Sequence, residues 1–333
     1  GSGLVGSEMC IRDRFTSCYE EDTLTPTEGG IELRFKVPQG NNSWDDDIAQ
    51  IYEDYNVYLI YKDLQRADFN RSWTGISYGS GYEGQGCVND EMTNYYVEFM
   101  KKHIFAYLNP PITSKVLPMY WYLGYNVYSK SVLEVGGVIL ASWIVPIHEN
   151  YDGLDYWCTC MFGEDNPSDP YLIPTDRALL DRRRKMILAP VLEKAVKAGN
   201  IIIPEEFEVG FDHVTNLIAG LGMEDDPNYY LTRGYPGSVN TYVFNSISEP
   251  ANNSYPPTNE ETFIGYMHLS MYYNQARLAE VYPADKYPFL TEKFAFVQKY
   301  LKDKYQIDLE AIANGPEDWD LPLPPIPETP DEE

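Results

Sequence analysis

Positive charge is scarce in this sequence. Lys and Arg together number 25 against 51 Asp and Glu, which gives a formal net charge of −26. A surface this negative repels phosphate backbones, so nucleic acid is excluded as a partner. Long apolar runs are also lacking: no stretch approaches the roughly 18 apolar residues that predict a transmembrane helix. We therefore expect the chain to meet neutral ligands or cations.

Histidine is the second scarce residue. The chain has four, His103, His148, His213 and His268, and no two of them stand four positions apart. An HExxH zinc site needs that spacing, because it places both imidazoles on one helix face. A metal cluster formed in three dimensions by His148, His213 and His268 with an acidic residue stays open as an alternative to histidines of structural role.

Apolar and aromatic residues, by contrast, are plentiful. Hydrophobic residues make up 44% of the chain, which is enough for a core and excludes wholesale disorder. The 29 tyrosines offer flat rings with polar tips, which suit sugar or peptide contacts as well as core edges. The longest apolar stretch, around 138–147, predicts a buried strand.

The first residues look foreign to the natural protein. Gly1-Ser2-Gly3 resembles a cloning scar, and residues 4–13 (LVGSEMCIRD) resemble a translated sequencing adapter. We therefore expect residues 1–14 to be an artefact, as an expression tag would be.

A lipid-attachment signal follows. Phe15-Thr16-Ser17-Cys18 resembles a bacterial lipobox, in which small residues let a signal peptidase cut before the cysteine. Cys18 would then carry the acyl chains that anchor the protein stably. The segment 19–22 (YEED) behind it, in which Glu20, Glu21 and Asp22 are acidic, resembles a surface-export signal. We expect residues 15–30 to be a lipobox remnant and linker; the alternative is that Cys18 is an ordinary buried or disulfide-bonded cysteine.

Three further cysteines stand in the body, Cys87, Cys158 and Cys160. An odd number argues against a full disulfide framework. Two interpretations stay open: one disulfide with a free thiol, or three reduced buried thiols.

The pattern of the body predicts strands first and helices later. Expected strands are 31–37, 56–62, 115–123 and 134–145, with a bulge or edge at Gly136-Gly137. Expected helices run from Trp44 to Asp54, from the cap Asn89 to Leu108, from Thr175 to Ala198, from the capping box of Thr258 and Glu261 to Glu280, from Thr291 to Lys304, and from Asp308 onward. Glycine-rich 75–86 and aromatic, acidic 146–174 are expected to be loops.

This order predicts an α+β fold, with a small mixed sheet followed by a mainly helical second half. We expect a single domain over residues 31–315 and a disordered, acidic, Pro-rich tail over 316–333.

Three segments resemble the substrate import-associated zinc metallohydrolase lipoproteins, which are HExxH peptidases. They are 52–64 (YEDYNVYLIYKDL), 133–143 (LEVGGVILASW) and 290–312 (LTEKFAFVQKYLKDKYQIDLEAI). The resemblance covers most of residues 31–312 and implies a zincin-like scaffold. It also implies a lipid-anchored protein on the outer membrane, facing outward, beside a TonB-dependent porin.

The same resemblance places Leu192-Glu193-Lys194-Ala195-Val196 where HExxH belongs. Glu193 stands at the remnant general-base position, but Leu192 and Val196 cannot bind zinc. The position of the third ligand falls near Gly265, which has no side chain. The resemblance therefore implies a degenerate member with no catalytic residue, no metal ligand and no cofactor. Glu193 can also be a solvated residue paired with Lys197.

Candidate contact residues for a glycan or peptide ligand are Trp143 and Trp157, at the ends of one expected loop, and Tyr78 and Tyr82. The basic run at 182–185 is expected to be a solvated face paired with nearby acids; the alternative is a docking patch.

We expect a non-catalytic surface lipoprotein that binds or docks in TonB-dependent nutrient import. The alternative is an active hydrolase, either zinc-dependent with atypical ligands or based on carboxylates.

Overall fold

The computed structural model describes residues 33–71, 81–151, 153–163 and 173–325, and it divides into two units, Gly1–Lys36 and Val37–Glu333. In the first unit, the described residues 33–36 form no strand. The prediction of a strand over 31–37 is therefore wrong for these residues, since no described strand pairs with them. Cys18 and Tyr78 lie outside the described residues.

Within the described residues of the second unit, the main sheet has six strands and is mixed. The strands are β1 (Tyr58–Ile60), β2 (Gly81–Gln85), β3 (Tyr120–Val135), β4 (Val138–Pro146), β5 (Glu149–Asn150) and β6 (Tyr156–Phe162). β3 is long enough to serve two sets of neighbours: β1 and β6 run parallel to its first half, and β2 and β4 run antiparallel to its second half. A small separate sheet pairs β7 (Ser238–Val239) with β8 (Ile247–Ser248).

β6 is buried along its whole length. Its sequence, YWCTCMF, lies inside the segment 146–174 that was expected to be a loop, so that expectation is wrong here. A continuous apolar run without alternation is what a strand covered on both faces shows. Trp157 of β6 and Trp121 of β3 pack edge to face, with ring centroids 5.2 Å apart.

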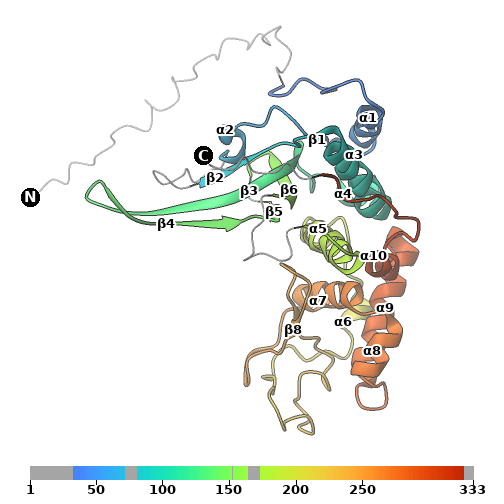
Figure 1. Ribbon diagram of the computed structural model, residues 1–333. Helices are drawn as coiled ribbons and strands as arrows, with labels where there is room; N and C mark the ends of the chain where they lie inside the picture. Colours follow the sequence, from blue (N-terminus) through green and yellow to red (C-terminus); the bar gives the residue numbers. More distant parts are fainter. Residues whose placement is uncertain (1–32, 72–80, 152, 164–172, 326–333) are drawn as a thin grey trace, which may run out of the picture. The chain divides into compact units, whose positions relative to one another are not determined.

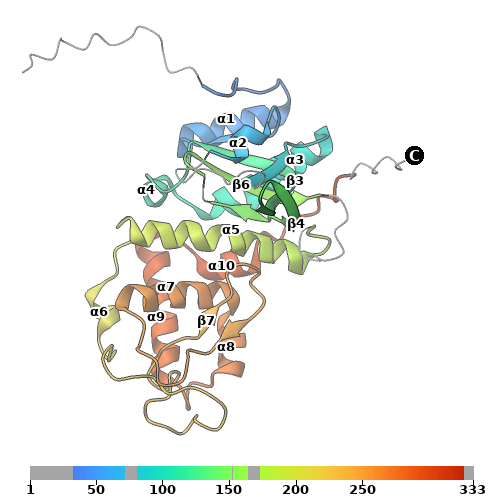
Figure 2. The same cartoon turned by 90° about the vertical axis from the view of Figure 1, so that its left-hand side faces the viewer.

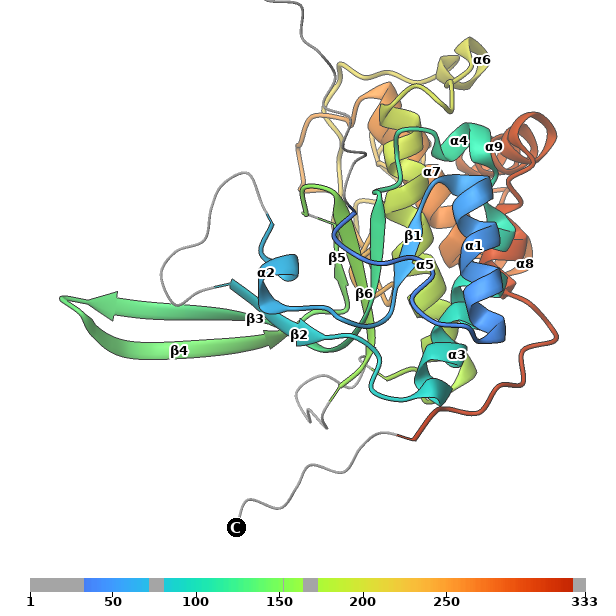
Figure 3. The same ribbon diagram turned by 90° about the horizontal axis from the view of Figure 1, so that it is seen from above.

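β3 and β4 form a hairpin that extends away from the rest of the sheet (Figures 1 and 3). Gly136 and Gly137 both have positive φ, 60° and 83°, and make its two-residue turn. The bulge expected at these glycines lies instead where the register of β3 and β4 shifts, between Leu133 and Glu134. The strand predicted near 138–147 is confirmed as β4, but the prediction that it is buried is wrong, because Val138, Ile139 and Leu140 are about 60% exposed. Residues 81–85 form β2, so the prediction of a loop over 75–86 is wrong for these residues.

The described helices confirm most sequence-based expectations, but the helix expected from Thr258 to Glu280 is broken at Tyr273 and Asn274 into two helices. The described helices are α1 (Ser43–Tyr55), α2 (Arg66–Phe69), α3 (Asp90–Phe99), α4 (Pro110–Thr113), α5 (Arg177–Lys197), α6 (Glu205–Glu208), α7 (Asn259–Tyr272), α8 (Gln275–Val281), α9 (Pro288–Tyr305) and α10 (Leu309–Asn314). Asn89 caps α3 through Met92 N, and Thr258 and Glu261 form the capping box of α7. After α3 the chain continues as a π turn, Met100–Ile104, and a 3-10 turn, Phe105–Tyr107. Within the described residues, no helix is long and apolar enough to cross a membrane.

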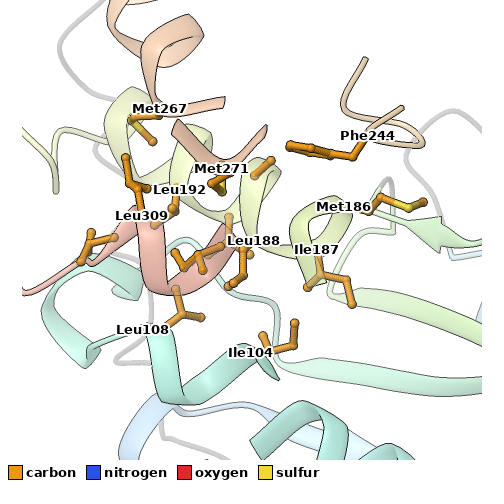
Figure 4. Packing of buried hydrophobic residues seen from close by; sticks show 14 of the residues in the cluster. Ile104, Leu108, Met186, Ile187, Leu188, Leu192, Phe244, Met267, Met271 and Leu309 are labelled. Carbon is orange, nitrogen blue, oxygen red and sulfur yellow. The ribbon is translucent and has the colours of Figure 1, made fainter. Parts of the chain in front are cut away.

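α5 lies between the sheet and the later helices (Figure 2). Its buried residues include Ile187, Leu188 and Leu192, which contact a core shared with Ile104, Leu108, Met267, Met271 and Leu309 (Figure 4). The second unit is thus a mixed α/β structure in which one helix connects the strands of the first half with the helices of the second.

Residues 316–325 differ from the expected disordered tail. Trp319 packs edge to face on Tyr95 at 5.3 Å and on His103 at 4.6 Å. Asn89 Nδ2 donates to the Pro325 carbonyl at 2.9 Å. These contacts hold the described part of the tail against α3.

Cys87, Cys158 and Cys160 are free thiols. Burial raises the pKa of Cys87 to about 12, and burial likewise raises the pKa of Cys158. Of the two interpretations that the sequence left open, the structure confirms three reduced thiols.

Candidate functional site

A cavity of about 220 Å³ lies between α5, β5 and the turn that follows β7. Its lining residues are Glu149, Tyr151, Met186, Pro190, Glu193, Thr241 and Tyr242. Two glutamates therefore line the cavity. Glu193 of α5 stands at the remnant general-base position that the resemblance implied, and Glu149 comes from β5.

Pro190 shapes one wall of this cavity. A proline inside a helix has no N–H to donate, so the carbonyl four residues earlier loses its helical partner. In α5 that carbonyl belongs to Met186, and the Tyr151 hydroxyl lies 3.5 Å from it. Tyr151 is thereby held against α5.

Glu149 is buried at the back of the site. Pairing of β5 with β6 sets it opposite Thr159, whose Oγ1 donates to Glu149 Oε2 at 2.7 Å. Arg183 Nη1 of α5 donates to Glu149 Oε1 at 3.2 Å. The Arg183 side chain is only 1% exposed and the Glu149 side chain only 7%. Trp121 Nε1 donates to Thr159 Oγ1 at 2.9 Å and completes the chain of bonds.

Burial raises the pKa of Glu149 to about 7, although Arg183 and Thr159 favour the charged form and oppose the shift. A carboxyl with this pKa is present in both protonation states near neutral pH. Glu149 can therefore donate a hydrogen bond as an acid or accept one as a carboxylate.

Glu193 is less buried, with a third of its side chain exposed. Lys197 Nζ donates to its Oε1 at 2.6 Å, which confirms the pairing expected from the sequence. From α7, His268 Nε2 approaches its Oε2 at 3.9 Å. Burial lowers the pKa of His268 to about 4, although Glu193 opposes the shift, so the imidazole is neutral at pH 7.

Tyr242 gives the cavity an exposed aromatic wall. Tyr242 is 58% exposed, and its ring stacks on the buried His148, with centroids 5.6 Å apart and planes 18° from parallel. A flat ring held from behind in this way can pack on the apolar face of a sugar or on another ring.

The described residues do not fit a zinc ion. Within them, no three His, Cys, Asp or Glu residues gather to hold a metal, whereas catalytic zinc takes three protein ligands. Leu192 and Val196 are buried in the core, and Gly265 faces Pro236. His213, for its part, contacts the Pro257 carbonyl at 2.7 Å, so the cluster of three histidines is not formed in the described structure.

The aromatic contact candidates are scattered. Trp143 is 52% exposed on β4, and Tyr82 is half-buried on β2, where its backbone bonds to Asn70. Trp157 is 5% exposed and packs behind Tyr151, with centroids 4.9 Å apart. Trp157 thus lies in a buried strand rather than in a contact loop, and none of these three lines the cavity.

The basic run 182–185 is not the solvated face that the sequence suggested. Arg183 reaches Glu149, and Arg184 donates to the carbonyls of Ile312 and Ala313 and to Asp181, with both guanidinium groups fully buried. The sequence contained a signal for the burial of these two arginines. Arg183 and Arg184 lie three and four residues after Leu180 and share a helix face with Leu180 and Ile187, which are core residues. Glu149 had no comparable signal, because its short strand looked like loop.

Comparison with known proteins gives little further guidance. No family model matches the chain, and no curated protein matches its sequence. One crystal structure is similar, that of a "putative zinc-binding metallo-peptidase" from Bacteroides caccae, at 13% identity and a TM-score of 0.34, over 82% of this chain and 91% of that chain. This likeness is too loose to transfer a fold or a zinc site to this chain.

Proposed function

We propose that this protein is a non-catalytic surface lipoprotein that binds a neutral sugar unit of a glycan in the cavity beside α5. The observation that carries the proposal is the set of groups around that cavity: the exposed ring of Tyr242 and the carboxyl groups of Glu149 and Glu193. Sugars bind proteins through ring stacking and through hydroxyls that donate to carboxylates. A chain of charge −26 also favours neutral ligands over anions.

The wider setting rests on the sequence. The lipobox-like residues Phe15 to Cys18 support attachment to the outer membrane, and the resemblance to degenerate zinc metallohydrolase lipoproteins supports a role beside a TonB-dependent porin. In this setting the protein would capture glycan, or peptide, for import. Labelling with radioactive palmitate in a Gram-negative host tests the anchor, and Cys18→Ser should abolish the label.

Isothermal titration against a panel of neutral mono- and oligosaccharides tests the binding. We expect Tyr242→Ala and Glu193→Gln each to weaken binding about tenfold, the cost of one lost stacking or charge-assisted contact. Tyr255→Ala is the matched control, because Tyr255 is 82% exposed and does not line the cavity. Binding only to peptides, or binding unchanged in both cavity variants, would contradict the sugar proposal.

A carboxylate-based glycoside hydrolase is the second candidate, and the raised pKa of Glu149 favours it. One neutral and one ionised carboxyl group are the requirement for such chemistry. Release of reducing sugar by the wild type, lost in Glu149→Gln, would support this candidate. Binding without release supports the first.

A further inference from the structure

The free part of the β3–β4 hairpin is unusually apolar for a surface element. We call residues 131–145 the arm. Its exposed large apolar side chains are Leu133, Val135, Val138, Ile139, Leu140, Trp143, Ile144 and Val145, with exposed fractions between 46% and 61%. Glu134 is the one charged residue of the arm.

Both faces of the arm are apolar. Successive side chains of a strand point to opposite faces, so Trp143 and Val145 lie on one face and Ile144 on the other. They are 52%, 51% and 61% exposed. Eight large apolar side chains, each about half exposed, together expose apolar surface of roughly several hundred Å². That area is as large as the largest patch of many monomers and approaches the apolar share of one side of a stable dimer interface.

The backbone groups at the outer edge of β4 also need hydrogen-bond partners. Within the described residues, β4 pairs only with β3, so its other edge presents unpaired backbone N–H and C=O groups. A long, apolar, unpaired edge is a template for another strand. A lipid bilayer would cover the side chains, but it would leave these backbone groups and Glu134 without partners in hydrocarbon.

We propose that the arm is a dimerisation element, in which β4 pairs edge to edge with β4 of a second copy. Two identical strands related by a two-fold axis in one sheet must run antiparallel. With the axis at Ser142, the middle of Val138–Pro146, Ala141 lies opposite Trp143 of the partner subunit. Leu140, the extra residue of β4 where its register with β3 shifts, then lies beside Ile144 of the partner subunit. The two Glu134 side chains then lie at opposite ends of a four-stranded sheet, so they do not repel each other.

Sedimentation velocity of the full chain, with Cys10 and Cys18 changed to serine to prevent unrelated disulfides, tests the proposal. We expect a monomer–dimer equilibrium that strengthens with salt, because salt screens the repulsion between two strongly negative chains. Leu140→Lys and Ile144→Lys should each weaken the dimer about tenfold or more. Leu221→Lys is the matched control, since Leu221 is 97% exposed and lies outside the arm.

Cross-linking tests the register. Ser142→Cys in the same background should form an intermolecular disulfide under mild oxidation, whereas Ser131→Cys, on the other strand of the arm, should not. A wild type that stays monomeric at every concentration, or a dimer that the arm variants leave intact, would overturn the proposal. Flotation of a monomeric protein with phosphatidylcholine vesicles, lost in Leu140→Lys, would overturn it in favour of a lipid contact.

Discussion

Glu193 Oε2 and His268 Nε2 face each other across the contact between α5 and α7, 3.9 Å apart. Within the described residues, the imidazole nitrogen has no hydrogen-bond partner. Both residues were candidates for metal chemistry in the sequence, yet together they are fewer than the three protein ligands that catalytic zinc takes. Their relationship has a measurable consequence for stability.

The first prediction concerns the pH dependence of folding. Burial lowers the pKa of His268 from 6.5 to about 4. Between these values the unfolded chain binds the proton and the folded chain does not, so stability rises with pH and is lost as pH falls from 6.5 toward 4. We expect His268→Gln to remove up to about 3 kcal/mol of this dependence.

Urea unfolding of both proteins at several pH values measures that difference. Glu149, whose pKa is raised, has the opposite dependence, but it is present in both chains and cancels in the comparison. His213→Gln is the control. An identical pH profile for wild type and His268→Gln would show that the buried imidazole does not titrate as described.

The second prediction concerns the Arg183–Glu149 ion pair. Arg183→Met leaves a buried carboxyl without its cation, which should lower the free energy of unfolding by about 3–5 kcal/mol. Adding Glu149→Gln removes the unpaired charge and should recover much of the loss. Urea unfolding at pH 8, above the pKa of Glu149, measures both. A double variant no more stable than Arg183→Met alone would show that packing, not charge, dominates the site.

The third prediction concerns Arg184. Its guanidinium donates to the carbonyls of Ile312 and Ala313 at 2.7 and 3.2 Å, so it fastens the end of α10 to α5. We expect Arg184→Leu to cost about 3 kcal/mol and to speed hydrogen exchange in residues 309–315. The surface residue Arg277, 60% exposed, gives the control variant Arg277→Leu, with a change below about 0.5 kcal/mol. Hydrogen exchange in residues 309–315 that is no faster in Arg184→Leu than in Arg277→Leu would refute a local role for Arg184.

The fourth prediction concerns close backbone packing at Gly86. A Cβ at this position would lie 2.2 Å from the Tyr61 carbonyl oxygen, so the backbone has to move. We expect Gly86→Ala to lower the free energy of unfolding by about 2 kcal/mol or more, as overpacking does. Thermal unfolding followed by circular dichroism measures the change. A melting temperature equal to that of the wild type would show that Gly86 and Tyr61 can move apart without loss of stability.

The sequence predicted the elements that rest on local rules. The Asn89 cap and the Thr258–Glu261 capping box are both confirmed, because capping involves residues near in sequence. Burial at longer range was harder to predict. The arm and β6 are both apolar runs, but only the tertiary arrangement decides that one is covered and the other is not.

The site was only half predictable for the same reason. Glu193 could be located through a resemblance in register along one helix. Glu149 comes from β5 and lines the same cavity as Glu193, and His268 comes from α7 and approaches Glu193. Only the packing of β5 and α7 on α5 brings these residues near Glu193. Single residues at such distances leave no periodic signal in the sequence.

The central place of α5 bears on how the second unit unfolds. This helix buries side chains around most of its circumference, and its neighbours include the strand that carries Glu149 as well as α7 and α10. Neither group of neighbours can separate from the other without exposing the same apolar helix to water. Residues 37–325 should therefore melt in one cooperative step, with a single calorimetric peak whose enthalpy matches the van't Hoff value.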